Sequence, residues 1–186
     1  MALTPSNMLE LQTPAPDFKL TDVISGNVLT LSELSLGKRG VLVMFICNHC
    51  PYVKHVQPQL LKLANDYQKQ DIAIIAISSN DVDSYPEDSP ELMLEEAKKW
   101  QYPFPYLYDE TQKVAKAYKA ACTPDYFLFD RNLLLVYRGQ LDDSRPGNNM
   151  PLDGKSLREA INNLLSGIPV SENQVPSVGC NIKWKD

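Results

Sequence analysis

The sequence has little of what membrane proteins, nucleic-acid-binding proteins and disulfide scaffolds require. Its longest apolar stretch is residues 41–46, far short of the roughly 18 to 20 apolar residues that span a bilayer. No block of Lys or Arg that could neutralise phosphates occurs along the chain, and the formal net charge is -5 at pH 7. We therefore expect a soluble protein whose partners are neither membranes nor nucleic acids.

The chain also lacks the marks of a secreted protein. Residues 1–14 contain no basic start followed by an apolar run and a small-residue cleavage site, so we expect a cytoplasmic protein. Its 4 cysteines are too few for a disulfide scaffold in 186 residues. In a reducing compartment a Cys-x-x-Cys pair is more often redox-active or metal-binding than structural, and Cys47 and Cys50 form such a pair.

Length and composition fit one domain. The chain has 186 residues, of which 44% are hydrophobic, and it contains no internal repeat and no long linker. We predict a single domain over residues 1–186, with a loose arm at residues 1–14 and a tail at residues 168–186.

Strands and helices alternate in the first half of the sequence. Residues 17–21 and 28–31 predict a short hairpin. Residues 41–46 and 72–77 are continuous apolar runs, typical of strands that are buried on both faces. Between these two runs, apolar residues recur at spacings of three and four over residues 53–67, which predicts a helix. A parallel, right-handed crossover is therefore expected.

An insertion follows the second of these core strands, over residues 80–108. It begins with a polar loop and continues with a helix that Ser89 caps and Pro90 opens. Asp109, with Gln112 three residues later, predicts the start of another helix by a variant of the capping box.

The last elements complete an α/β arrangement. Residues 126–129 and 133–137 predict an antiparallel pair of strands joined by a short turn. A final helix is expected over about 155–165, with Gly167 past its end. The order of elements predicts a central mixed sheet with helices on both faces, and it resembles the order of a thioredoxin core.

The motif Cys47-Asn48-His49-Cys50 lies between a buried strand and a helix. Backbone amides and the dipole at a helix N-terminus stabilise a thiolate, so we predict that Cys47 lies there, is more acidic than a free cysteine and attacks disulfides. Cys50, one turn deeper, is predicted to resolve the mixed disulfide. His49 either stabilises the thiolate and tunes the redox poise, or is an exposed histidine without a specific partner.

Half of a zinc site is the competing interpretation of the cysteine pair. Cys122 and Cys180 stand alone, and the histidines at 49 and 55 are too near the pair to close a typical structural site. We therefore expect no metal and no cofactor. Cys122 and Cys180 are either auxiliary thiols or small buried residues, and nothing in the sequence determines whether Cys180 folds back to the active site.

The strand, the Cys-x-x-Cys motif, the helix and the later segment Ala121-Cys122-Thr123-Pro124 together resemble the thioredoxin superfamily. In that superfamily the loop that faces the two cysteines carries a cis-proline. The resemblance implies a cis bond between Thr123 and Pro124, and an exposed backbone there that pairs with an extended substrate. By this resemblance Thr123 and Pro124 bind the substrate.

Residues 13–20 and the insertion resemble the redoxin branch of that superfamily, which includes the AhpC/TSA and peroxiredoxin-like proteins. The runs at 45–55, 139–146 and 176–185 resemble a peroxiredoxin-like family within it. A peroxiredoxin places Thr or Ser three residues before its peroxidatic cysteine, where this sequence has Met44 or Cys47. Met44 also stands where thioredoxins carry a buried aspartate. The resemblance therefore does not extend to a peroxidase pocket.

The leading hypothesis is a thiol-disulfide oxidoreductase that acts on protein disulfides and is served by a thiol reductant or reductase. The first alternative is a thiol-dependent hydroperoxide reductase with an antioxidant role, which the redoxin resemblance supports and the missing Thr or Ser opposes. The second is a metal-binding chaperone, which is disfavoured because no histidine follows His55. The sequence leaves the oligomeric state open.

Overall fold

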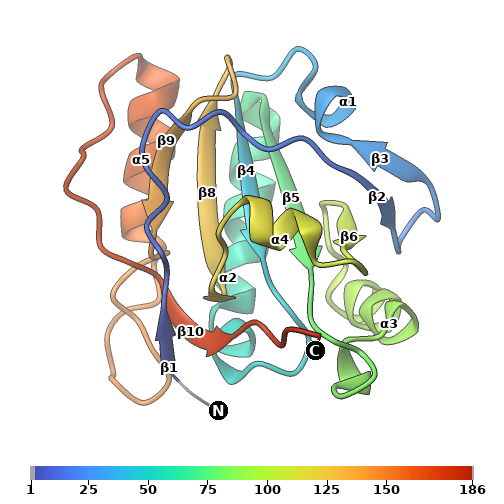
Figure 1. Cartoon of the computed structure of the whole chain (residues 1–186). Helices are drawn as coiled ribbons and strands as arrows, with labels where there is room; N and C mark the ends of the chain where they lie inside the picture. Colours follow the sequence, from blue (N-terminus) through green and yellow to red (C-terminus); the bar gives the residue numbers. More distant parts are fainter. Residues whose placement is uncertain (1–2, 186) are drawn as a thin grey trace.

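A seven-stranded mixed sheet forms the centre of the molecule, which we describe over residues 3–185 from a computed structural model (Figure 1). The strand order is β3-β2-β6-β5-β4-β8-β9. The strands of this sheet are β2 (Lys19–Asp22), β3 (Val28–Thr30), β4 (Gly40–Phe45), β5 (Ile72–Ser78), β6 (Tyr106–Tyr108), β8 (Asp125–Asp130) and β9 (Leu135–Gly139). β4 pairs in parallel with β5 and antiparallel with β8, which confirms the predicted crossover and the mixed sheet.

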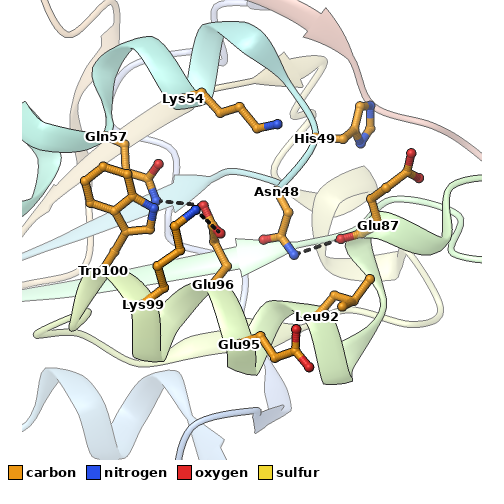
Figure 2. A pocket seen from close by; sticks show the side chains of 10 residues that line it. All are labelled: Asn48, His49, Lys54, Gln57, Glu87, Leu92, Glu95, Glu96, Lys99 and Trp100. Atoms are coloured by element: carbon orange, nitrogen blue, oxygen red, sulfur yellow. Dashed lines mark hydrogen bonds and ion pairs between the residues drawn. The ribbon is translucent and has the colours of Figure 1, made fainter.

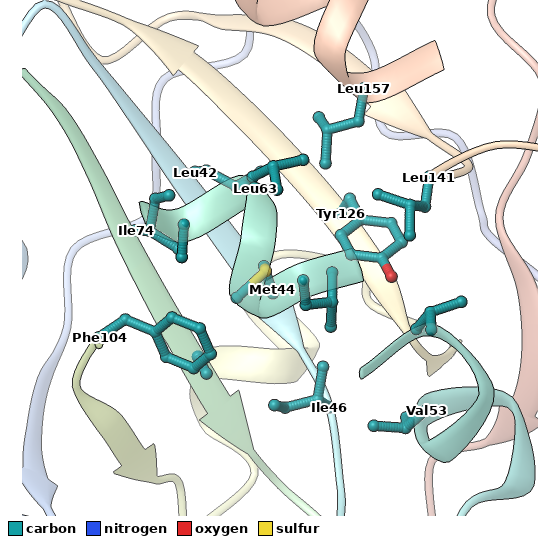
Figure 3. Packing of buried hydrophobic residues seen from close by; sticks show 14 of the residues in the cluster. Leu42, Met44, Ile46, Val53, Leu63, Ile74, Phe104, Tyr126, Leu141 and Leu157 are labelled. Atoms are coloured by element: carbon teal, nitrogen blue, oxygen red, sulfur yellow. The ribbon is translucent and has the colours of Figure 1, made fainter. Parts of the chain in front are cut away.

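Helices cover both faces of this sheet. They are α1 (Leu31–Ser35), α2 (Pro51–Tyr67), α3 (Pro90–Trp100), α4 (Lys113–Ala117) and α5 (Lys155–Ser166), with 3-10 turns η1 (Gln68–Gln70) and η2 (Pro86–Asp88). Leu42 and Met44 of β4 share a core with α2, α3 and α5, part of which Figure 3 shows. Val41, Val43 and Phe45 face a second core that α1 and α4 close. The alternation follows from the two-residue period of a strand buried on both faces.

A second, three-stranded sheet joins the two ends of the chain. Its order is β1 (Leu3–Pro5), β10 (Val178–Asn181) and β7 (Cys122–Thr123), so β10 lies between a segment from the start of the chain and one from its middle. Figure 1 shows β1 and β10 next to each other. The arm at residues 1–14, which was predicted to be loose, contributes β1, and the predicted tail contributes β10. Both are too short to show a period of two in sequence, and only their pairing with each other and with β7 makes them strands.

The predicted cap and stop signals hold for two of the helices. The Ser89 side chain accepts a hydrogen bond from the amide of Leu92 at the start of α3, and Gly167 ends α5 in the left-handed conformation. Asp109 does not start α4, whose N-cap is Gln112. Its carboxylate instead accepts bonds from the Ala115 amide and from Ser79, so it ties the helix to the end of β5.

Within residues 3–185, none of the helices combines the length and the apolar character that crossing a membrane would require.

Candidate active site

The Cys-Asn-His-Cys motif connects the end of β4 to the first turn of α2. Cys50 is the N-cap of α2 and Pro51 is its first helical residue. Proline fits the first helical position because it lacks an amide hydrogen, and it keeps the preceding residue extended; Cys50 has φ -67 and ψ 122. The prediction that Cys47 lies at the helix N-terminus was therefore wrong, because Pro51 places Cys50 there.

Three of the four cysteines meet beside Thr123. The Cys50 sulfur lies 2.8 Å from the Cys180 sulfur and 3.2 Å from the Thr123 carbonyl oxygen. The Cys47 sulfur lies 3.3 Å from the Thr123 hydroxyl. Cys47, Cys50 and Cys180 are all buried, with exposures of 2%, 0% and 4%. We call these three residues and Thr123 the sulfur cluster.

Within the sulfur cluster, the surroundings of Cys50 favour a thiolate. A hydrogen bond from Cys47 lowers the pKa of Cys50 to about 5, and Cys180 and the Val53 amide in the first turn of α2 add to this against the cost of burial. The pKa of Cys47 is raised well above its ordinary value by the same bond to Cys50, by burial and by the nearby Asp88 carboxylate. These directions favour Cys50 over Cys47 as the thiolate of the pair, in contrast to the assignment made from the sequence.

His49 has a specific partner on the other side of the motif. Its Nδ1 lies 2.6 Å from Oδ2 of Asp88, a fully buried carboxylate in η2. This bond raises the pKa of His49, so the ring carries a proton more readily than a free histidine. Burial would raise the pKa of Asp88, but hydrogen bonds from His49 and Asn80 outweigh it and hold that pKa below the ordinary value.

Asp88 also holds the backbone of the motif. Its Oδ1 accepts hydrogen bonds from the amides of Asn48, at 2.7 Å, and His49, at 3.2 Å, while Asn80 donates to Oδ2 at 2.7 Å. Tyr85 stacks on the His49 ring with centroids 5.2 Å apart. Asp88 was missed by the sequence analysis because it lies in a polar loop far along the chain, and no local pattern marks it.

The bond between Thr123 and Pro124 is cis, as the thioredoxin resemblance implied. The backbone beside it is not free, however. Thr123 and Cys122 pair antiparallel with Cys180 and Asn181 of β10. The edge that the resemblance assigned to an extended substrate is thus taken by the chain's own C-terminal strand, which the sequence did not predict.

Cys122 and Asp125 flank Thr123 and Pro124 in the chain. The Cys122 sulfur lies 3.6 Å from the Pro124 carbonyl oxygen, and burial raises its pKa, which is typical of a small buried residue rather than of a reactive thiol. Asp125 is fully buried, and burial raises its pKa to about 7. Its position directly after the cis-proline, at the start of a strand that continues with Tyr126 to Phe129, was the available signal for this buried acid.

Comparison with known proteins places this arrangement in a family. The AhpC/TSA family model matches residues 11–138. The chain belongs to the AhpC/TSA family. The crystal structure of an uncharacterized conserved protein from Geobacillus kaustophilus is 58% identical and covers 100% of this chain and 97% of its own, with a TM-score of 0.97.

Two further matches extend the comparison. The thiol-disulfide oxidoreductase ResA of Geobacillus thermodenitrificans is 29% identical over 130 residues, which cover 69% of this chain and 68% of ResA. The thioredoxin domain of a thiol-disulfide oxidoreductase from Bacteroides vulgatus has a TM-score of 0.62 at 20% identity, covering 81% of this chain and 96% of that one. This AhpC/TSA protein has the thioredoxin fold that its sequence predicts.

One group of residues in this AhpC/TSA protein could hold a metal ion. Cys47, His49 and Asp88 each offer one ligand atom, and these atoms lie within 4.8 Å of one another. A thiolate, an imidazole and a carboxylate suit zinc. In the structure the His49 Nδ1 and the Asp88 carboxylate are bonded to each other, so a metal would compete with that bond.

A groove of about 790 Å³ opens beside the motif, between α2 and α3. Figure 2 shows His49 and Glu87 near one end and Gln57 and Trp100 near the other, with Asn48 between them. The Asn48 side chain donates to the Glu87 carbonyl oxygen and accepts from the Tyr106 hydroxyl. The two residues between the cysteines therefore connect the sulfur cluster to this groove.

Proposed function

We propose that the protein is a thiol-disulfide oxidoreductase whose Cys47 and Cys50 cycle between dithiol and disulfide, with protein disulfides as substrates. The observation that carries this proposal is the geometry of the pair: Cys50 caps α2, and the sulfurs of both cysteines lie against Thr123, next to the cis-proline. A helix N-terminus and a neighbouring thiol both favour a thiolate there. The ResA proteins of two bacteria, each 29% identical to this chain, are named thiol-disulfide oxidoreductases, which supports the same chemistry.

The cycle begins at the Cys50 thiolate. Its sulfur attacks a substrate disulfide, so that a bond forms between Cys50 and one substrate sulfur while the other leaves as a thiolate and takes up a proton. Cys47 then loses its proton and attacks the Cys50 sulfur, which releases the second substrate thiol. The substrate gains two electrons, the Cys47–Cys50 pair becomes a disulfide, and a thiol reductant or reductase restores the dithiol.

Residues around the pair supply charge and position. Besides the bond to Asp88, a negative charge on Cys50 raises the pKa of His49. This attraction acts in both directions, so a protonated His49 also stabilises a thiolate on Cys50. The Thr123 hydroxyl lies within hydrogen-bond distance of the Cys47 sulfur, and the Thr123 carbonyl oxygen accepts a hydrogen bond from Cys50 while Cys50 is a thiol. This revises the roles predicted from the sequence, in which Cys47 attacks and Cys50 resolves.

An insulin-reduction assay with dithiothreitol tests the proposal. We expect turnover by the wild type and loss of turnover in Cys50→Ser. A mixed disulfide on Cys50 should accumulate when Cys47→Ser is combined with Cys180→Ser, which removes the other thiol beside Cys50. Cys122→Ser is the matched control, because it removes a buried thiol that contacts Pro124 and is expected to keep wild-type turnover. No turnover by the wild type would refute the proposal.

A hydroperoxide-consumption assay, run in parallel, tests the antioxidant alternative. Membership of the AhpC/TSA family favours that alternative, whereas Cys47 occupies the place three residues before Cys50 where a peroxiredoxin has Thr or Ser. Peroxide consumption without disulfide turnover would replace the proposed function with a peroxidase. Silence in both assays would direct attention to metal binding at Cys47, His49 and Asp88. A cytoplasmic location stays a prediction.

A further inference from the structure

The C-terminal strand β10 is built to fit against the cis-proline loop. Gly179 of β10 lies so close to Thr123 that an added Cβ would stand 2.0 Å from the Thr123 carbonyl oxygen and 3.2 Å from the Pro124 nitrogen. A side chain at this position would clash with backbone, so only glycine permits the approach. The Ser177 hydroxyl adds a 2.6 Å hydrogen bond to the Pro124 carbonyl oxygen.

Bonds on both sides of Cys180 keep it in this position. After it, the amide of Ile182 donates to the carbonyl oxygen of Ala121, and the amide of Lys183 donates to the side chain of Asn80. Along its other edge, β10 pairs with β1 over Val178 to Cys180. The position of Cys180 beside Cys50 is therefore fixed by the fold rather than by the two sulfurs.

Cys180 stands where the sulfur of an extended substrate would meet Cys50. Residue 180 is paired with Thr123, next to the cis-proline, and its sulfur lies 2.8 Å from the Cys50 sulfur. A disulfide needs about 2.05 Å between sulfurs, so a small movement is enough to form one. Burial and the bond to Cys50 raise the pKa of Cys180 to about 12, which keeps it a thiol beside the Cys50 thiolate while the protein is reduced.

We propose that Cys180 is a third redox-active cysteine, which β10 presents to Cys50 as a built-in substrate and which forms a Cys50–Cys180 disulfide when the protein is oxidised. This inference rests on the proposed redox cycle of Cys47 and Cys50. Starting from the Cys47–Cys50 disulfide, Cys180 loses a proton and attacks the Cys50 sulfur. The Cys50–Cys180 bond forms, the Cys47–Cys50 bond breaks, and Cys47 leaves as a thiolate and takes up a proton. No external oxidant is consumed in this exchange.

The exchange gives the oxidised protein two places for one disulfide. In the Cys50–Cys180 form, Cys47 is a thiol again and β10 is covalently tied to α2 across the cis-proline loop. A partner that binds beside Thr123 must displace β10, because β10 occupies that edge. The Cys50–Cys180 disulfide therefore persists until such a partner displaces β10.

Disulfide mapping of the oxidised full-length protein tests the inference. Cys47→Ser is treated with diamide, quenched in acid, alkylated, digested and analysed by mass spectrometry. We expect a linked peptide pair containing Cys50 and Cys180, with loss of two thiols per chain. Adding Cys180→Ser should abolish the link, whereas adding Cys122→Ser, the matched control, should leave it. Reduced Cys50, a Cys50–Cys122 link or only intermolecular dimers would overturn the inference.

A second variant tests the role of the strand without changing any sulfur. Cys47→Ser carrying Gly179→Ala should give at least about tenfold less Cys50–Cys180 disulfide in the same time, because the added methyl group pushes β10 from Thr123. Circular dichroism verifies that the Gly179→Ala variant is folded. If that variant does not fold, the inference is tested by Cys47→Ser with Cys180→Ser, in which the Cys50–Cys180 disulfide must be absent. An undiminished yield in folded Gly179→Ala would contradict the substrate-like placement.

The outcome can be separated from that of the proposed function. If the wild type reduces insulin and the Cys50–Cys180 link is absent, the inference alone fails. If the link forms and insulin is not reduced, the proposed function fails and the third redox-active cysteine stands.

Discussion

The two sides of the Cys-Asn-His-Cys motif differ in the chemistry of their side chains. On one side His49, Asp88, Asn80 and Tyr85 form a polar flank, in which a single buried carboxylate accepts hydrogen bonds from two backbone amides, an imidazole and an amide side chain. On the other side lies the sulfur cluster, where the thiols contact one another and Thr123. The polar flank fixes the shape and charge of the motif, while the sulfur cluster holds the groups that exchange electrons.

This difference predicts how each side responds to mutation. Removal of a buried carboxylate that accepts several hydrogen bonds leaves their donors without partners. Its main effect is therefore a lower free energy of unfolding. Removal of a thiol from the sulfur cluster alters the redox products and leaves the surrounding hydrogen bonds largely in place. The predictions below run from the largest expected loss of stability to the smallest.

Asp88→Ala breaks the polar flank at its centre. We expect the free energy of unfolding to fall by about 3 to 4 kcal/mol, because the donors of Asn48, His49 and Asn80 lose their acceptor in a buried site. Urea denaturation measures this loss. Glu87→Ala, at the neighbouring exposed residue, is the control and should change stability by no more than about 0.5 kcal/mol. If Asp88→Ala and Glu87→Ala both changed the free energy of unfolding by the same small amount, the polar flank would not hold the motif.

Gly179→Ala disturbs the strand that carries Cys180. The added methyl group must move away from the Thr123 carbonyl oxygen, and we expect a loss of about 2 to 3 kcal/mol in the free energy of unfolding. Val178→Ala, at the adjacent half-buried residue, should cost only about 1 kcal/mol. A Gly179→Ala protein as stable as wild type would mean that β10 tolerates a wider spacing from the cis-proline loop.

His49→Gln tests how the stability from the polar flank depends on pH. Because Asp88 raises the pKa of His49 in the folded protein, the stability from this pair is complete below the unfolded pKa of about 6.5 and is lost as pH rises through the folded value. We expect the wild type to lose about 1 to 2 kcal/mol over this range, the size of a hydrogen bond to a charged group. In urea titrations at stepped pH, His49→Gln should lack this loss and His55→Gln should retain it. The same loss in His49→Gln would assign it to another group.

Much of the fold could be predicted from local patterns in the sequence. The apolar runs of β4 and β5, the periodicity of α2 and the Ser89 cap of α3 each act over a few residues, and the structure confirms them. The strand β10 could not be predicted in the same way. Its pairing with β1 and β7 joins segments far apart in the chain, and its residues alone show no strand period.

The candidate site was predictable in its residue types and less so in its geometry. The Cys-x-x-Cys motif and the cis bond at Pro124 follow from sequence and resemblance. The start of α2 was misplaced, although Pro51 carried the signal, since the residue before a proline avoids helical angles. Asp88 and Cys180 reach the motif only through tertiary contacts, so no spacing in the sequence identifies them.

The location of the thiolate is the central claim, and a site-resolved titration tests it most directly. The NMR shift of the β-carbon of each cysteine, followed in the reduced wild-type protein from about pH 4 to pH 9, reports which sulfur loses its proton. We expect Cys50 to titrate near pH 5, with Cys47 and Cys180 protonated throughout. Titration of Cys47 at low pH, with Cys50 protonated at neutral pH, would contradict the assignment and return the attacking role to Cys47.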